Sequence, residues 1–178
     1  MKKTIFLLML IISGFVFGQD IPIFQFSNSG FNNNVIYDVP NQNKEEIYNK
    51  VVEWVNINYK NPENVIKGKI ENEYIRIEGY NDNGICNKFL GSLTCWGLYY
   101  TLEINIKDNK YKLSFFDIHT FEKEKQSIDI YQKTLYDKNG SLKKSGETIY
   151  ISLNKSINDI SVGLNQYLKN KTKINSDW

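Results

Sequence analysis

Asp117 and His119 form the one pair of side chains here whose types and spacing suit acid–base chemistry. His119 is the single histidine of the chain, in the stretch FFDIH. On a strand, residues two apart share a face, so the carboxylate could orient the imidazole as a base or begin a metal site. If side chains alternate between the two faces of the strand from Phe115 onward, Asp117 points to the core, unless a bulge at Phe115–Phe116 turns it outward. No motif supplies a nucleophile or a second histidine for zinc, so a polar pair at a strand end is favoured over a hydrolase.

Cys86 and Cys95 are the two cysteines of the sequence, separated by eight residues in the stretch CNKFLGSLTC. Two cysteines allow one intramolecular bridge, and an oxidising compartment favours it. A bridge that closes so short a loop contributes about 2–3 kcal/mol in the chain-entropy treatment. Two buried free thiols remain the alternative to the predicted disulfide.

The first residues, MKKTIFLLMLIISGFVFGQD, have the layout of a secretory signal peptide. Two lysines precede a short apolar run that ends at Val16, and the run is shorter than the roughly 20 residues of a membrane span. We expect cleavage between Gly18 and Gln19 and a mature protein that is periplasmic or secreted. An uncleaved N-terminal anchor is the alternative, while the absence of a cysteine after the run argues against a lipoprotein anchor.

The composition excludes several classes of partner. Loss of Lys2 and Lys3 would lower Lys+Arg from 22 to 20, which equals the 20 Asp+Glu. Nucleic-acid binders normally carry an excess of basic residues, so nucleic acid is not an expected partner. Arg76 is the single arginine, which argues against a dedicated anion clamp. The glycines form no phosphate-binding motif, and we expect no cofactor and no metal site.

The stretch EEIYNKVVEWVNINY predicts a helix with one apolar face. Asn43 and Glu46 have the spacing of a capping box, and Pro62 stops the helix after about Tyr59. A short strand, VIYDV, precedes this helix, and a C-terminal helix follows Ser156, which with Asp159 forms a second possible capping box. The stretch between residues 120 and 146 is charged and irregular, with a turn at Asn139-Gly140.

Two hairpins are expected between the helices. A turn at Asp108-Asn109 pairs apolar residues with apolar residues throughout, namely Ile106 with Tyr111, Ile104 with Leu113 and Leu102 with Phe115. For the earlier hairpin, a tight turn at Asn72-Glu73 pairs Ile70 with Ile75 and Gly68 with Ile77.

The element order predicts an α+β fold: a two-layer sandwich of strand, helix, four antiparallel strands and helix, with both helices on one face of the sheet. We divide the chain into a signal peptide (1–18), an N-terminal polar segment (19–34), a single domain (35–170) and a frayed tail (171–178).

The run from Glu45 to Gly79, read with the later LEINIKDNKYKLSFFDI, resembles a family of exported bacterial, Bacteroidetes-type proteins. The resemblance spans Val35 to Leu168 and is most specific at Glu53-Trp54-Val55 and in the strands after Pro62. The family is described as a domain of unknown function with a TATA-binding-protein-like fold. The resemblance implies this fold, and it supplies no catalytic residues.

Aromatic residues suggest two binding functions beside a purely structural role in the core. The favoured function is a non-enzymatic module with a cavity for a small apolar or envelope-derived ligand, lined by Trp54, Tyr100, Phe115 and Tyr167. The alternative is an envelope protein-interaction or inhibitor module, which would use an exposed patch at Trp96 and Tyr99 or the loop between the cysteines. A hydrolase that uses Asp117 and His119 is the least favoured function.

Overall fold

The computed structural model describes residues 23–121 and 126–170. The predicted signal peptide, its cleavage point and the predicted frayed tail lie outside these residues. The described elements are, in chain order, β1 (Phe26–Ser27), β2 (Gly30–Phe31), β3 (Asn34–Asp38), α2 (Lys44–Asn58), α3 (Pro62–Val65), β4 (Ile66–Ile70), β5 (Tyr74–Phe89), β6 (Ser92–Lys107), β7 (Lys110–Thr120), β8 (Gln126–Ser127), α4 (Asp129–Leu135), the 3-10 turn η1 (Lys144–Gly146) and α5 (Glu147–Lys169).

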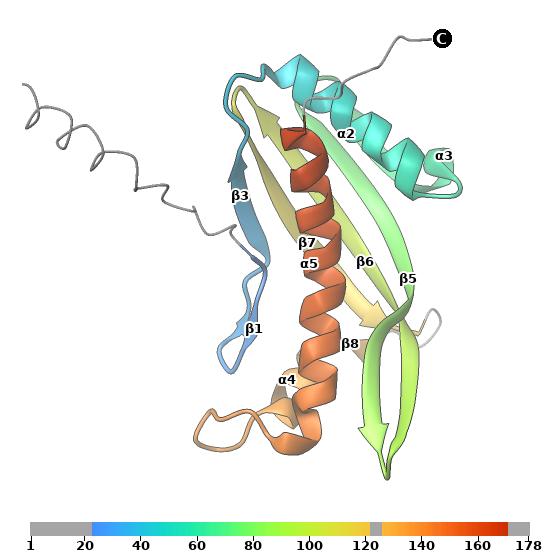
Figure 1. Cartoon of the computed structure of the whole chain (residues 1–178), viewed down its shortest axis with the longest axis vertical. Coiled ribbons are helices and arrows are strands. Elements are labelled where there is room, and N and C mark those ends of the chain that lie inside the picture. The colour runs from blue at the N-terminus through green and yellow to red at the C-terminus, as the bar shows by residue number, and fades with distance from the viewer. Residues whose placement is uncertain (1–22, 122–125, 171–178) are drawn as a thin grey trace, which may run out of the picture.

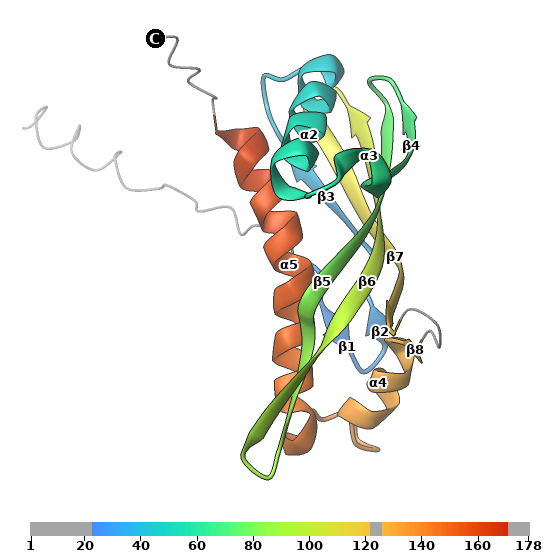
Figure 2. The same ribbon diagram turned by 90° about the vertical axis from the view of Figure 1, so that its right-hand side faces the viewer.

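The main sheet is antiparallel, with strand order β3-β7-β6-β5-β4 and with β8 paired to β7. Helices α2 and α5 lie on one face of this sheet, and within residues 23–121 and 126–170 the other face carries no helix of comparable length (Figures 1 and 2). The predicted two-layer α+β sandwich is therefore confirmed. Among the described residues, no helix is both long and apolar enough to cross a membrane.

Helix α2 begins as its sequence predicts. The Asn43 side chain accepts a hydrogen bond from the Glu46 amide, and the Glu46 carboxylate accepts one from the Asn43 amide, which completes the capping box. Its apolar face is buried against the molecule's own sheet and against α5, with Ile47, Val51 and Val55 fully covered. This face has a structural role.

The predicted hairpin at Asp108-Asn109 is confirmed in full. Asn109 adopts a φ of 64° in the turn, and the three predicted apolar pairs are present in the β6–β7 register. The inward residues of β5, β6 and β7 form one core with the helices, and its fully buried members include Ile75, Ile77, Leu102, Ile104, Leu113, Leu153, Ile157, Leu164 and Leu168.

The predicted register of the earlier hairpin is wrong by one residue. Asn72 has a φ of 61°, which allows a three-residue turn, so Ile70 pairs with Tyr74 instead of Ile75. Ile70 is therefore turned outward and is 58% exposed. A bulge after Ile66 restores the alternation and places Ile66 opposite Ile77.

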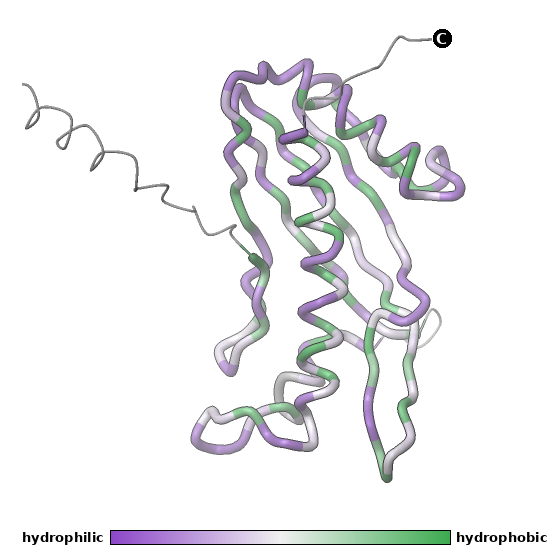
Figure 3. The backbone as a smooth tube through the Cα atoms, in the orientation of Figure 1, coloured by the Kyte–Doolittle hydropathy of each residue, from purple (hydrophilic) through white to green (hydrophobic). Residues whose placement is uncertain are grey.

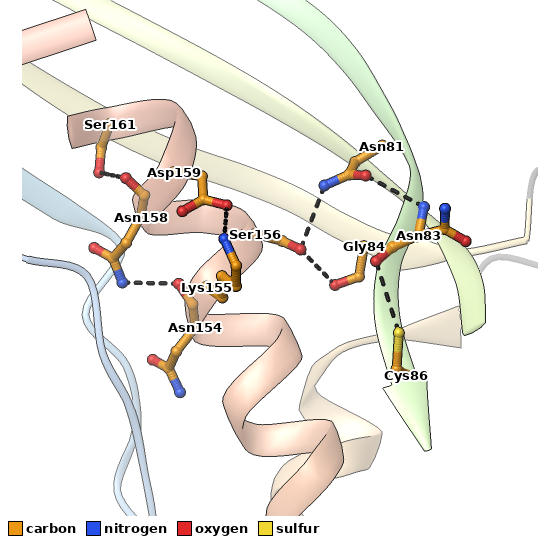
Figure 4. A network of polar contacts seen from close by, with 10 residues as sticks. All are labelled: Asn81, Asn83, Gly84, Cys86, Asn154, Lys155, Ser156, Asn158, Asp159 and Ser161. Atoms are coloured by element: carbon orange, nitrogen blue, oxygen red, sulfur yellow. Dashed lines mark hydrogen bonds and ion pairs between the residues drawn. The ribbon is translucent and has the colours of Figure 1, made fainter. Parts of the chain in front are cut away.

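The predicted start of the C-terminal helix is also wrong. Helix α5 begins at Glu147, and Ser156 lies in its interior. The Ser156 hydroxyl donates to the carbonyl oxygen of Gly84 at 2.7 Å, so it binds β5 rather than capping the helix (Figure 4). The apolar repeat of Ile149, Leu153 and Ile157, four residues apart, explains the longer helix.

The core extends beyond the predicted domain start at residue 35. Phe24 and Phe26 are buried in it. The Asn158 side chain accepts from the Phe24 amide at 2.9 Å and donates to the Phe24 carbonyl at 2.8 Å, while Asn154 accepts from the Phe26 amide. A small β1–β2 hairpin lies within the predicted N-terminal polar segment, residues 19–34.

Candidate functional site

A groove of about 770 Å³ lies where β5 continues past the end of β4. Strand β4 pairs with β5 only as far as Ile77, so the following residues of β5 lack a strand neighbour on that side. The end of α2 and the short α3 form the opposite wall. The lining residues come from both faces of the sheet: Asn58, Tyr59, Lys60, Asn61, Asn64, Val65, Lys67, Glu78, Gly79, Tyr80, Asp82, Tyr99, Tyr100, Thr101, Asp117 and His119.

Three rings run in a row across β5, β6 and β7 in this groove. Tyr80 and Tyr99 are directly paired in the register, with ring centroids 4.5 Å apart. The Tyr99 and His119 rings stack at 5.3 Å with planes 12° apart. Tyr80 is 50% exposed, whereas His119 is buried. Tyr80 is therefore the most exposed ring of the row, and its neighbours hold it in place.

Two glycines allow the rings to lie against the sheet. A Cβ atom at Gly97 would come within 2.3 Å of the Tyr80 ring, and one at Gly79 would come within 2.2 Å of the Tyr100 ring. Such distances are shorter than any van der Waals contact, so each tyrosine lies where only glycine leaves room. This is the arrangement in which an aromatic ring covers a strand glycine.

Tyr59 and Tyr100 meet at the inner side of the groove, where their hydroxyl oxygens lie 2.9 Å apart. Burial raises the pKa of both phenols above the ordinary value of 10.0, and the neighbouring Tyr100 raises the pKa of Tyr59 further. Both hydroxyls therefore remain protonated at neutral pH, and the pair joins the end of α2 to β6.

Asp117 lies at a bulge in β7. The pairing shifts between Tyr99–His119 and Thr101–Phe116, and Asp117 itself has a φ of 44°. The bulge sits one or two residues later than the Phe115–Phe116 position weighed from the sequence, and it has the expected effect of exposing Asp117.

The imidazole of His119 is held by the backbone of this bulge. Its Nδ1 atom lies 2.7 Å from the Asp117 carbonyl oxygen and 3.5 Å from the Asp117 carboxylate. A carbonyl oxygen can only accept, so Nδ1 is the donor of this hydrogen bond. Within residues 23–121 and 126–170, no Ser, Thr or Cys side chain hydrogen-bonds to this imidazole. The backbone of the bulge therefore fixes the orientation of the imidazole.

Carboxylates outnumber ammonium groups in the lining. The lining contains three carboxylates, Glu78, Asp82 and Asp117, and two lysines, Lys60 and Lys67. The Lys67 ammonium lies 3.7 Å from the Glu78 carboxylate. The groove is thus slightly negative and rich in hydrogen-bond acceptors. In the part of the chain that is described, no group of three or more His, Cys, Asp or Glu could hold a metal ion.

The four residues predicted to line an apolar cavity are placed in and around the core. Trp54, Tyr100 and Phe115 are buried in it, and the Tyr100 and Phe115 rings pack edge to face at 5.6 Å. Tyr167 is partly buried at the core boundary, where burial and the neighbouring Glu53 of α2 raise the pKa of its phenol. Tyr100 also lines the groove, so it is the one member of the set that reaches the candidate site.

The predicted partner patch is divided between two places. Trp96 packs with Ile85, Leu135 and Ile149 in a second, smaller core under α4 and α5. Tyr99 points to the groove instead. The alternation of a strand accounts for this division, because residues three apart lie on opposite faces.

The predicted bridge between Cys86 and Cys95 is present. The two cysteines are directly opposed in the β5–β6 register, with Cα atoms 4.0 Å apart. The bridge therefore joins strands that the ladder already pairs.

Tyr80 and Tyr59 line the groove although the sequence did not single them out as site residues. Tyr80 follows Glu78 and precedes Asp82 at outward positions of one strand, a pattern that indicates an exposed aromatic between carboxylates. Arg76, the single arginine, lies outside the groove and binds the Glu103 carboxylate on the neighbouring strand.

The antiparallel sheet with two helices on one face defines the class, a two-layer α+β domain of the TATA-binding-protein type. Residues 33–121, half of the 178-residue chain, match the family described as a domain of unknown function (DUF4468) with TBP-like fold. The chain belongs to this family. Neither the fold class nor the family description assigns an activity, since fold alone does not define function.

Two crystal structures share this fold. A TBP-like protein from Parabacteroides distasonis is 15% identical, with a TM-score of 0.56, over 77% of this chain and 91% of that one. A DUF4468 family protein from Bacteroides ovatus is 14% identical, with a TM-score of 0.56, over 76% of this chain and 81% of that one. A search of curated proteins finds no match.

Proposed function

We propose that the chain is an exported, non-enzymatic binding module whose groove takes a neutral glycan of the cell envelope. The observation that carries the proposal is the half-exposed Tyr80 ring, held by Tyr99 and Gly97 at the floor of a groove lined by carboxylates. The signal-peptide pattern of the first residues supports the exported location.

The chemistry of the lining favours a sugar over a lipid or an anion. An aromatic face is electron-rich, so it attracts the C–H groups on one face of a sugar ring. Carboxylates such as Glu78 and Asp82 accept hydrogen bonds from hydroxyl groups, and these charge-assisted bonds are the stronger kind. An anionic ligand would meet more negative than positive charge here, and a lipid tail would meet too many polar groups.

The arrangement of His119 supports binding rather than hydrolysis. Its Nδ1 is committed to the backbone carbonyl of Asp117, and the ring stacks on Tyr99. His119 thus extends the row of rings and stiffens it from the β7 side.

The test is a titration of the chain, from Gln19 onward, with the β-1,4-linked tetramer of N-acetylglucosamine. Binding is measured by calorimetry and by saturation-transfer NMR. We expect measurable binding that Tyr80→Ala weakens about tenfold or more, because an exposed stacking ring is lost. Tyr74→Ala is the matched control, since Tyr74 lies on the same strand outside this groove, and it should bind as the wild type does.

Several outcomes would overturn the proposal. They are no binding by the wild type, or binding that both tyrosine variants retain equally. Release of free sugar that His119→Ala abolishes would establish a hydrolase instead. Native mass spectrometry of the chain from its host's envelope adds a check, because a co-purified protein in place of a sugar mass would favour an interaction module.

A further inference from the structure

The β5–β6 hairpin extends beyond every other strand of the main sheet. Its pairing continues to Phe89 and Ser92, whereas β7 stops pairing with β6 at Tyr99. Figures 1 and 2 show the two paired strands running past the end of the sheet to a free tip. The hairpin end therefore projects from the body of the molecule.

The tip of this hairpin is apolar and exposed. Leu90 is 91% exposed, Phe89 is 72% exposed and Leu93 is 60% exposed. Figure 3 shows the hydrophobic colour at this end of the hairpin. A group of three neighbouring large apolar side chains that are mostly exposed is typical of an interaction site.

Folding alone does not account for the residue at the turn. Leu90 and Gly91 form a two-residue turn with φ values of 47° and 86°. Turns of this kind favour Asn, Asp or Gly at the first position, and a bulky side chain is strained there. Leucine is therefore unfavourable in this backbone conformation, and its exposed side chain gains no packing that would offset the strain.

The base of the projecting hairpin is firmly held. The Cys86–Cys95 bridge ties the strands together, and the Cys86 amide donates to the Ser152 hydroxyl of α5 at 2.9 Å. The Ser156 hydroxyl of the same helix holds Gly84 (Figure 4). The tip is consequently presented on a rigid arm, which lowers the entropy lost on binding.

The charge around the tip favours a negatively charged surface. Between Asn83 and Leu102 the sequence contains no Asp or Glu, and its one charged residue is Lys88, next to Phe89. Amphipathic segments that lie in a membrane interface combine apolar side chains with flanking cations in this way, and each cation near an anionic surface adds to binding.

We propose that the tip of the β5–β6 hairpin inserts Phe89, Leu90 and Leu93 into the headgroup region of an anionic lipid bilayer, with Lys88 at the phosphate level. This contact is reversible and interfacial. It does not rest on the proposed function of the groove, because it uses other residues of the two strands.

The test is co-sedimentation with vesicles of phosphatidylcholine and phosphatidylglycerol in a 3:1 ratio, using the chain from Gln19 in all variants. Leu90→Asn should lower the bound fraction at least fivefold while keeping or raising the unfolding midpoint, because Asn suits the turn. Ile57→Asn is the matched control, since Ile57 is 65% exposed on α2, and it should bind as the wild type does. Lys88→Gln should weaken binding to these vesicles and not to neutral ones.

The proposal fails if the wild type does not sediment with these vesicles, or if Leu90→Asn binds as well as the wild type does. Capture of a protein that depends on Leu90, without vesicle binding, would also overturn it in favour of a protein partner. Tyr80→Ala should leave vesicle binding unchanged, so this test and the glycan titration fail independently.

Discussion

Gly79 has only a hydrogen atom where other residues have a Cβ atom, and this leaves room for the Tyr100 ring to connect the sheet with α2. The Tyr100 ring lies over this glycine, and its hydroxyl reaches Tyr59 at the end of α2. Gly163, in α5, has open space where a Cβ would be placed. The same substitution should therefore have opposite effects at the two positions.

Gly79→Ala should lower the free energy of unfolding by about 1–3 kcal/mol, because the new methyl group overpacks against the ring. Gly163→Ala should raise the free energy of unfolding by about 0.5–1 kcal/mol through helix propensity. Urea denaturation measures both. Equal stability of the two variants would show that Tyr100 can move aside without loss.

Helix α5 acts as an element that holds two distant segments by polar side chains. On one side Asn154 and Asn158 bind the backbone of Phe24 to Phe26, and on the other Ser152 and Ser156 bind β5. These side chains supply hydrogen-bond partners to backbone groups that no neighbouring strand pairs on that side.

Asn158→Ala should lower the free energy of unfolding by about 1–3 kcal/mol, because it leaves the buried Phe24 amide and carbonyl without partners. Hydrogen exchange should accelerate first at Phe24, ahead of the β6 amides. Asp159→Ala is the control: it removes only an exposed pair with Lys155, worth about 0.5 kcal/mol or less. Unchanged exchange at Phe24 in Asn158→Ala would contradict the clamp.

Elements were predictable from the sequence where one pattern excluded its competitors. The β6–β7 register followed from three consecutive apolar pairs, and a shift by one residue would have exposed all of them. The β4–β5 hairpin offered two turns of similar quality, and Asn72 at positive φ decided between them only in three dimensions. The start of α5 was missed because the polar residues Ser152, Asn154 and Ser156 bind neighbouring segments in the fold, which the sequence does not show.

The candidate site was less predictable than the fold. The row of Tyr80, Tyr99 and His119 joins three strands, and its alignment depends on the bulge at Asp117. Sequence patterns give the face of each residue within a strand, and they do not give the offset between strands. Asp117 and His119 lie together as the sequence predicts. The sequence could not predict that Tyr99 and Tyr80 lie beside them.

On the scale of the whole molecule, β5 and β6 carry both proposed contacts. Tyr80 and Phe89 are nine residues apart on one strand, which corresponds to about 30 Å at the usual rise. A bilayer at the hairpin tip would therefore leave the groove open to glycan above the lipid surface. The main sheet keeps these two places at a fixed distance because both strands continue through the core.

Buried tyrosines are expected to limit the stability of the folded chain at high pH. Burial raises the pKa of Tyr37, Tyr59, Tyr100 and Tyr111 above the ordinary value of 10.0. A group whose pKa is higher in the folded state contributes its full stability below the pKa of the unfolded chain. We expect stability independent of these phenols up to about pH 9 and a fall above pH 10 of about 1.4 kcal/mol per pH unit for each phenol.

The measurement is urea denaturation at pH 7 to 11 of the wild type and of the double variant Tyr59→Phe, Tyr100→Phe. The variant removes both hydroxyls together, so it leaves no buried donor without a partner. Its stability should decline less steeply above pH 10, by the share of two tyrosines, while the decline due to Tyr37 and Tyr111 persists. Parallel curves for the two proteins would mean that the Tyr59–Tyr100 pair ionises while the chain remains folded, and that the inner side of the groove opens to water.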